Sequence, residues 1–134
     1  MKKVLIVEDQ KEIREILDEV FRLELGFSNV TFATDGLDGF TECYLQKFDL
    51  ICSDEAMPFC KGSDMVFAIR NKKGLNQFTP IIMLSSFVAE FTEKMKNIEI
   101  TYFVEKPIDM DRLRRYVKMA MNNQKKKVEL SGLV

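Results

Sequence analysis

Five short apolar runs, each followed by the pattern of an amphipathic helix, constrain this chain more than any other feature of its sequence. The first run, Lys3 to Val7, is continuous and contains β-branched residues, as in a strand buried on both faces. Further runs span residues 30–33, 48–53, 80–84 and 100–104. Alternating strands and helices with short connections predict an α/β fold, with a parallel sheet and helices on both of its faces.

The helices are predicted from apolar residues spaced three and four positions apart. Gly26 is expected to end the first helix. The residues expected to face inward are Ile13, Ile16, Leu17, Val20 and Phe21 in the first helix, Leu37, Phe40 and Tyr44 in the second, Met65, Val66 and Ile69 in the third, Val88, Phe91 and Met95 in a short fourth, and Leu113, Val117, Ala120 and Met121 in the last.

The composition excludes several kinds of function. The chain has no histidine, which removes Ser-His and Cys-His nucleophilic pairs and zinc sites built on histidine. Its formal net charge is −1, so no global electrostatic attraction to nucleic acid or membranes is expected. The apolar runs are too short to span a membrane, and carboxylates interrupt the first too soon for a signal peptide. Cys43 and Cys52 are expected in the core and Cys60 in a loop, in a reducing cytoplasm.

Unusual polar residues directly follow the carboxyl ends of the predicted strands. They are Glu8 and Asp9 after the first strand, Asp54 after the third, Ser85 and Ser86 after the fourth, and Lys106 after the fifth. The carboxyl ends of parallel strands share one edge, which is where ligands bind in such sheets. Three carboxylates brought together cost several kcal/mol unless cations compensate them. Lys106 is one cation, and carboxylates favour Mg²⁺ as the second.

A carboxylate beside Mg²⁺, a lysine and a hydroxyl can act as a general base or as a nucleophile towards phosphorus. Nucleophilic attack would form an aspartyl phosphate, with Mg²⁺ and Lys106 stabilising the transferred group and the serine hydroxyl donating to it. Alternatively, each acid is a solvated loop residue or a helix cap. The coincidence of Asp54, Ser85 and Lys106 at one edge favours a site over that alternative.

Five stretches of the sequence resemble the receiver domain of bacterial two-component response regulators. They are VLIVED, ATDGLDG, DLICSDEAMPFCKG, PIIMLSS and FVEKP, in the order of that family. The resemblance covers about residues 2–122. It implies a flavodoxin-like doubly wound (βα)5 fold with strand order 2-1-3-4-5. It also implies a receiver domain over residues 1–122, with residues 123–134 as the end of the last helix and a tail, or a linker to an output domain.

The resemblance implies a role for each polar residue at this edge. Asp54 is the expected phosphoacceptor, with Lys106 and Ser85 as its catalytic partners. The expected metal ion is Mg²⁺. Its ligands are expected to be Asp9, Asp54 and the backbone carbonyl of Ala56, with Glu8 bound through water.

The resemblance also implies a switch made of Ser85 and Phe103. Phosphorylation adds about −1.5 to −2 charges beside Ser85, which is drawn inward so that Phe103 can enter the vacated space. The surface around the fourth helix, fifth strand and fifth helix then changes. The Lys106–Pro107 peptide bond is expected to be cis. Phe103 taken alone is also consistent with a core residue, and Ser85 with a cap of the fourth helix.

The predicted function is a phosphorylatable signalling switch that catalyses only its own phosphorylation and dephosphorylation. The expected donor is a histidine kinase or phosphotransfer protein, and the expected target a downstream protein or a linked output domain. Homodimerisation through the fourth and fifth helices is a further expectation. One alternative is a phosphate-independent, receiver-like interaction module. Another is an aspartyl-phosphate phosphatase, which is disfavoured because Ala56 stands where that chemistry needs a second acid.

Overall fold

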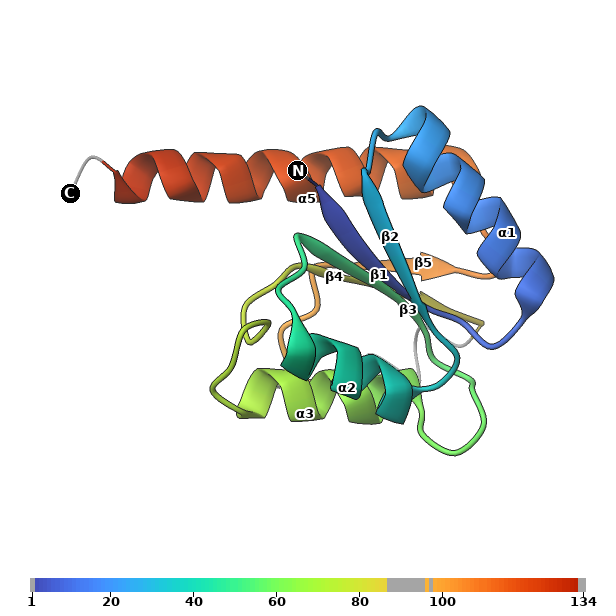
Figure 1. Ribbon diagram of the computed structural model, residues 1–134. Coiled ribbons are helices and arrows are strands. Elements are labelled where there is room, and N and C mark those ends of the chain that lie inside the picture. Colours follow the sequence, from blue (N-terminus) through green and yellow to red (C-terminus); the bar gives the residue numbers. More distant parts are fainter. Residues whose placement is uncertain (1, 87–95, 97, 133–134) are drawn as a thin grey trace.

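A five-stranded sheet lies between two layers of helices in the computed structural model, which describes residues 2–86, 96 and 98–132 (Figure 1). The strands are β1 (Lys3–Val7), β2 (Asn29–Ala33), β3 (Leu50–Asp54), β4 (Ile81–Ser85) and β5 (Tyr102–Glu105). All neighbouring strands pair in parallel, in the order β2-β1-β3-β4-β5. The predicted flavodoxin-like fold and its strand order are therefore confirmed.

Helices cover both faces of the sheet. They are α1 (Lys11–Glu19) with its π-helical continuation η1 (Val20–Glu24), α2 (Gly36–Leu45), α3 (Gly62–Asn71) and α5 (Met110–Ser131). Figure 1 shows α2 and α3 side by side on one face, and α1 and α5 on the other. The predicted fourth helix, with Val88, Phe91 and Met95, lies outside the described residues. No helix in the described part of the chain is long and apolar enough to cross a membrane.

Successive strand residues pack on opposite faces of the sheet, which explains why the strands read as continuous apolar runs. The cluster under α1 and α5 includes Val4, Ile6, Leu17, Phe21, Cys52, Leu84, Leu113 and Val117. The cluster under α2 and α3 includes Leu5, Val7, Cys43, Ile51, Met65, Ile69 and Met83. Cys43 and Cys52 are buried and Cys60 is half-buried, as the sequence predicts.

The strands lie within two residues of their predicted bounds, and two of the differences affect the site. Strands β3 and β4 each run one residue further than predicted. Asp54 and Ser85 are consequently the last residues of their strands, where ladder hydrogen bonds still hold the backbone. Strand β5 begins at Tyr102 instead of Ile100.

The inward faces of α1 and α2 differ from prediction. Ile16 is 49% exposed, and Leu37 and Tyr44 are 64% and 70% exposed, so the expectation that they face inward is wrong. Small residues form the inward face of α2. A Cβ on Gly39 would lie 2.5 Å from Sδ of Met65, so a larger residue there would force Met65 to shift. The larger side chains of α2 therefore face outward.

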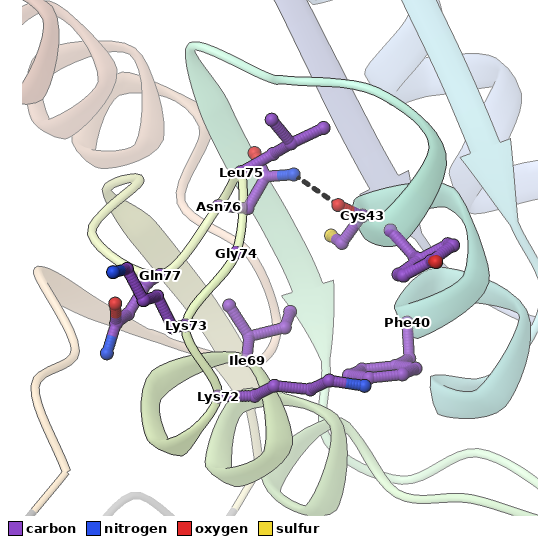
Figure 2. A pocket seen from close by; sticks show the side chains of 10 residues that line it. Phe40, Cys43, Ile69, Lys72, Lys73, Gly74, Leu75, Asn76 and Gln77 are labelled. Carbon is purple, nitrogen blue, oxygen red and sulfur yellow. Dashed lines mark hydrogen bonds between the residues drawn. The ribbon is translucent and has the colours of Figure 1, made fainter.

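The loop that leaves α3 is fixed to the end of α2 (Figure 2). The buried Asn76 side chain donates through Nδ2 to the carbonyls of Cys43, at 2.7 Å, and Gln46, at 2.8 Å. Its Oδ1 accepts from the N–H of Phe48 at 2.9 Å. These hydrogen bonds tie the C-terminal end of α2 to the loop that follows α3.

Replacing Gly26 should destabilise the fold, because Gly26 has φ +70° at the end of the first helical segment. Gly26→Ala is expected to lower the free energy of unfolding by about 1 kcal/mol, since a Cβ disfavours the left-handed conformation. Urea unfolding measures the change. Gly74→Ala is the matched control, because Gly74 has an ordinary φ and the nearest atom to its added Cβ would be 3.9 Å away. Equal losses in the two variants would contradict the role assigned to Gly26.

Candidate functional site

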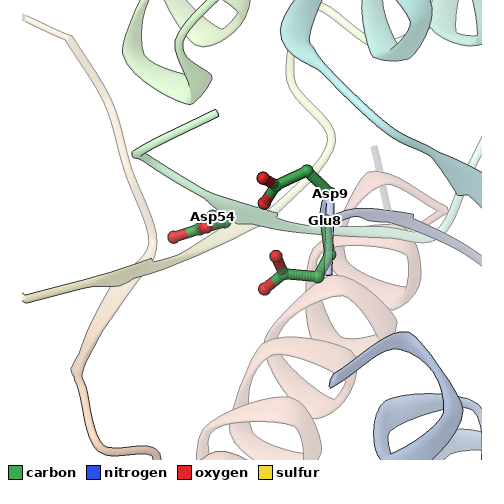
Figure 3. A group of neighbouring side chains, drawn as sticks. All are labelled: Glu8, Asp9 and Asp54. Atoms are coloured by element: carbon green, nitrogen blue, oxygen red, sulfur yellow. The ribbon is translucent and has the colours of Figure 1, made fainter. Parts of the chain in front are cut away.

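Three carboxylates meet at the carboxyl ends of the neighbouring strands β1 and β3 (Figure 3). One oxygen from each of Glu8, Asp9 and Asp54 lies within 4.8 Å of the others. Glu8 is fully buried, Asp54 is 3% exposed and Asp9 is exposed. The fold thus brings together all three acids that the sequence singles out, with Asp9 on the solvent side.

Lys106 places a positive charge beside these acids. Its Nζ lies 2.9 Å from Oδ1 of Asp54 and 3.7 Å from Oε1 of Glu8. The backbone N–H of Lys106 donates to the carbonyl of Ser85 at 2.9 Å, which ties the end of β5 to the end of β4. The Lys106–Pro107 peptide bond is cis. Among the described residues, Lys106 is the cation that forms ion pairs with this cluster, and its single charge does not balance three carboxylates.

Arg14 fixes the turn that carries two of the acids. Its Nη1 donates to the backbone carbonyls of Glu8 and Asp9, each at 2.9 Å. Sequence reasoning did not find this role. The available signal was an arginine within the first turns of the helix that follows the acid pair.

Glu55 fixes the other side of the site. Its N–H donates to Oδ1 of Asp54 at 2.8 Å, and its Oε1 accepts from the N–H of Ser63 at 2.8 Å, at the start of α3. A Cβ on Gly62 would overlap the carbonyl oxygen of Asp54. The start of α3 thus packs directly against the end of β3. Glu55 lies eight residues from the N–H that it caps, so no local capping pattern reveals it.

Ser85, Phe103 and Ala56, the other residues predicted to belong to the site, come from three different segments. Ser85 ends β4 and is 4% exposed. By the alternation of strand side chains it lies on the same sheet face as Met83, and Phe103 of β5 packs partly buried in the cluster on that face. Ala56 is exposed in the loop after β3. Their assignment as switch residues and metal ligand stays a prediction.

Glu8 is the electrostatically unusual member of the cluster. Burial, and then the negative charge of Asp54, raise the pKa of Glu8 to about 7. Its Oε2 accepts from the N–H of Gln10 at 3.2 Å. Its buried Oε1 has no hydrogen-bond partner among the described residues, because Lys106 stands too far away for a hydrogen bond. A buried oxygen without a donor, in an all-oxygen group of ligands, fits a hard cation such as Mg²⁺.

The raised pKa of Glu8 predicts a pH dependence of stability. Between its ordinary value of 4.5 and about 7, the folded protein keeps a proton that the unfolded chain releases. The stabilising contribution is complete below pH 4.5 and is lost as the pH rises through 7. In chelator-treated protein, this loss should amount to roughly 3 kcal/mol.

Urea unfolding across this pH range, in wild type and in Glu8→Gln, measures the effect. The variant should lack the decline, whereas the exposed-site control Glu12→Gln should keep it. Parallel pH profiles in wild type and Glu8→Gln would show that Glu8 does not titrate in this way.

The fold and the acidic edge define a signalling domain of the receiver class. The response regulator receiver domain family matches residues 4–118, and the chain belongs to that family. The chemotaxis protein CheY of Pseudomonas aeruginosa is 32% identical over 84 residues, which are 63% of this chain and 66% of that protein. The chain thus spans less than two thirds of the length of this curated relative.

Solved structures show the same fold. Chemotaxis response regulator CheY4 of Vibrio cholerae superposes with a TM-score of 0.79 at 30% identity, over 90% of this chain and 98% of that one. The receiver domain of a sensor histidine kinase from Pseudomonas aeruginosa PAO1 gives a TM-score of 0.79 at 22% identity, with the same coverage. That structure has a magnesium ion coordinated in its active site cleft.

Proposed function

We propose that this receiver domain accepts a phosphoryl group on Asp54, in a reaction that requires Mg²⁺. The observation that carries the proposal is the 2.9 Å approach of Lys106 Nζ to Asp54 Oδ1, inside a cluster of three carboxylates. The chain contains no histidine. The proposed donor is the phosphohistidine of a histidine kinase or a phosphotransfer protein, because these 134 residues offer none of their own.

The donor atoms at this edge suit Mg²⁺. The carboxylates of Asp9 and Asp54 and the backbone carbonyl of Ala56 would bind it directly, and Glu8 would bind it through water. The excess negative charge and the buried Glu8 oxygen support this assignment. Bound there, the ion supplies positive charge that lowers the repulsion between the carboxylates and an incoming phosphoryl group.

The proposed transfer is a displacement at phosphorus. An oxygen of Asp54 attacks the phosphorus atom, the bond from phosphorus to the donor's imidazole nitrogen breaks, and the imidazole leaves with the electron pair. The N–H of Glu55 and the Nζ of Lys106 both converge on Oδ1 of Asp54, which orients the carboxylate for attack through Oδ2. Lys106 also stabilises negative charge on the phosphoryl oxygens.

The proposed output is a change of surface that a partner reads. The Ser85 hydroxyl would donate to the phosphoryl group, and Phe103 would move into the space that Ser85 leaves. Such a coupling is typically worth about 1–3 kcal/mol, enough to change the affinity for a partner several-fold to a hundredfold. Residues 1–122 would form the receiver domain, and residues 123–134 a helical end, or a linker to an output domain.

Intact-mass measurement after incubation with acetyl phosphate and Mg²⁺ tests the phosphoacceptor. Wild type should gain one phosphoryl group, because Asp54 is the positioned nucleophile. The gain should be absent in Asp54→Asn and in a sample treated with chelator. Asp64→Asn is the matched control, since Asp64 is an exposed carboxylate on α3, and it should be labelled like wild type. If wild type stays unmodified while a known receiver is labelled in parallel, the phosphate-independent interaction module is favoured.

Removing the Lys106 charge should slow phosphorylation without abolishing it. Lys106→Gln is expected to lower the rate with acetyl phosphate by about 10²-fold or more, because a preorganised charge on the transferred group is lost. The rate is measured by quenched-flow mass spectrometry. Lys11→Gln, at an exposed position on α1, should react at the wild-type rate. A Lys106→Gln rate within threefold of wild type would remove Lys106 from the proposed chemistry.

A further inference from the structure

The outward face of α2 carries a stripe of apolar side chains, defined here as Leu37, Phe40, Tyr44 and Leu45 and called the α2 stripe. Leu37 is 64% exposed, Tyr44 70% and Leu45 66%. Leu37 and Tyr44 lie seven residues apart and therefore share one side of the helix. Exposed large apolar side chains that are neighbours on one surface mark interaction sites more often than singly scattered ones do.

A pocket opens beside the α2 stripe, between the C-terminal ends of α2 and α3 (Figure 2). Its volume is about 360 Å³, and its walls include Phe40, Tyr44, Ile69, Lys72 and Leu75. The ammonium of Lys72 lies 5.6 Å from the ring centre of Phe40 and 5.8 Å from that of Tyr44. The pocket is thus apolar with a cationic rim, and it can accept an apolar side chain from a partner.

The charges on this face have opposite signs at its two ends. Helices α2 and α3 run side by side in the same direction (Figure 1). Acidic residues gather at their N-terminal ends, namely Asp35, Asp38 and Asp64. Basic residues gather just past the C-terminal end of α3, namely Lys72 and Lys73. Lys61 and Glu42 run against this trend, and Glu42 accepts a hydrogen bond from Gln46.

A surface with one acidic and one basic end matches itself better than it matches a partner of uniform charge. A two-fold rotation about an axis perpendicular to α2 turns the helix end for end. The acidic end of one copy then meets the basic end of the other. Each such contact occurs twice, because a two-fold interface is made of the same patch on both copies.

We propose that the α2 stripe and its pocket form a self-association surface for a second copy of this chain. The two-fold axis passes near Thr41, midway between Leu37 and Leu45, so the two α2 helices cross antiparallel. Leu37 of one copy then packs against Tyr44 and into the pocket of the other, and the reciprocal contact forms at the other end. This surface is distinct from the fourth and fifth helices, where the sequence alone suggests dimerisation.

The area of the surface indicates a weak dimer. Leu37, Tyr44, Leu45 and Leu75 are each more than half exposed, and covering them removes roughly 100 Å² each, or about 400 Å² per copy, from water. With the polar rim, two copies bury about 1,000 Å², which is near the lower limit for a specific interface. The expected dissociation constant is therefore micromolar or weaker.

Sedimentation velocity of the full chain tests the proposal, at concentrations up to about 1 mM, where interfaces of this size associate. Wild type should shift from monomer to dimer as the concentration rises. Tyr44→Ser should raise the dissociation constant at least tenfold. Leu23→Ser is the matched control, because Leu23 is 78% exposed on η1, in the opposite helical layer. It should dimerise like wild type, and circular dichroism should show both variants folded.

A charge variant tests the match between the two ends of the surface. Lys72→Glu should also weaken the dimer, because it places an acid opposite the acidic end of the other copy. Three results would overturn the proposal. They are a wild type that stays monomeric over the whole range, a dimer that Tyr44→Ser leaves intact, or equal weakening by Tyr44→Ser and Leu23→Ser.

Discussion

The excess of negative charge at the carboxyl edge of the sheet is the constraint on which the rest of this structure depends. Three carboxylates share a space within 4.8 Å, with Lys106 as the cation beside them. Such a cluster persists only if rigid backbone holds it. Asp54 ends the central strand β3, which is paired on both sides by β1 and β4. Arg14 and Glu55 then anchor the two turns that follow the strands.

The site combines an inner strand of the sheet, which holds Asp54 firmly, with an edge strand, which is paired on one side and can move more easily. Strand β5 has a neighbour on one side alone within the sheet, and it carries Phe103 and leads into Lys106. Phe103 is only half-buried. In the proposed switch, a phosphoryl group on the firmly held Asp54 would act on a strand that is paired on one side alone within the described sheet.

The sheet and the acids were predictable because parallel strands place their carboxyl ends along one edge whatever the loops do. The face of α2 that packs on the sheet was not predictable. Small residues form that face, so the positions of the large apolar residues indicate the wrong side of the helix. The role of Glu55 was not predictable, because its carboxylate caps an N–H eight residues away. The role of Arg14 was not predictable either, because it contacts backbone carbonyls, which every residue has. Strand ends shifted by up to two residues because neighbouring strands, and not local composition, decide where a ladder stops.

The last helix is long enough that a small tilt at the sheet would move its far end by several ångströms. Tyr116 of α5 stacks on Tyr102 of β5, with ring centres 4.6 Å apart, and the helix continues to Ser131, beyond the sheet (Figure 1). From Tyr116 to that end is about 22 Å at the usual rise per residue. A tilt of about 10° at the tyrosine stack would then swing the tip by roughly 4 Å. A small tilt at the sheet edge would thus move the far end of α5 by more than the length of a hydrogen bond.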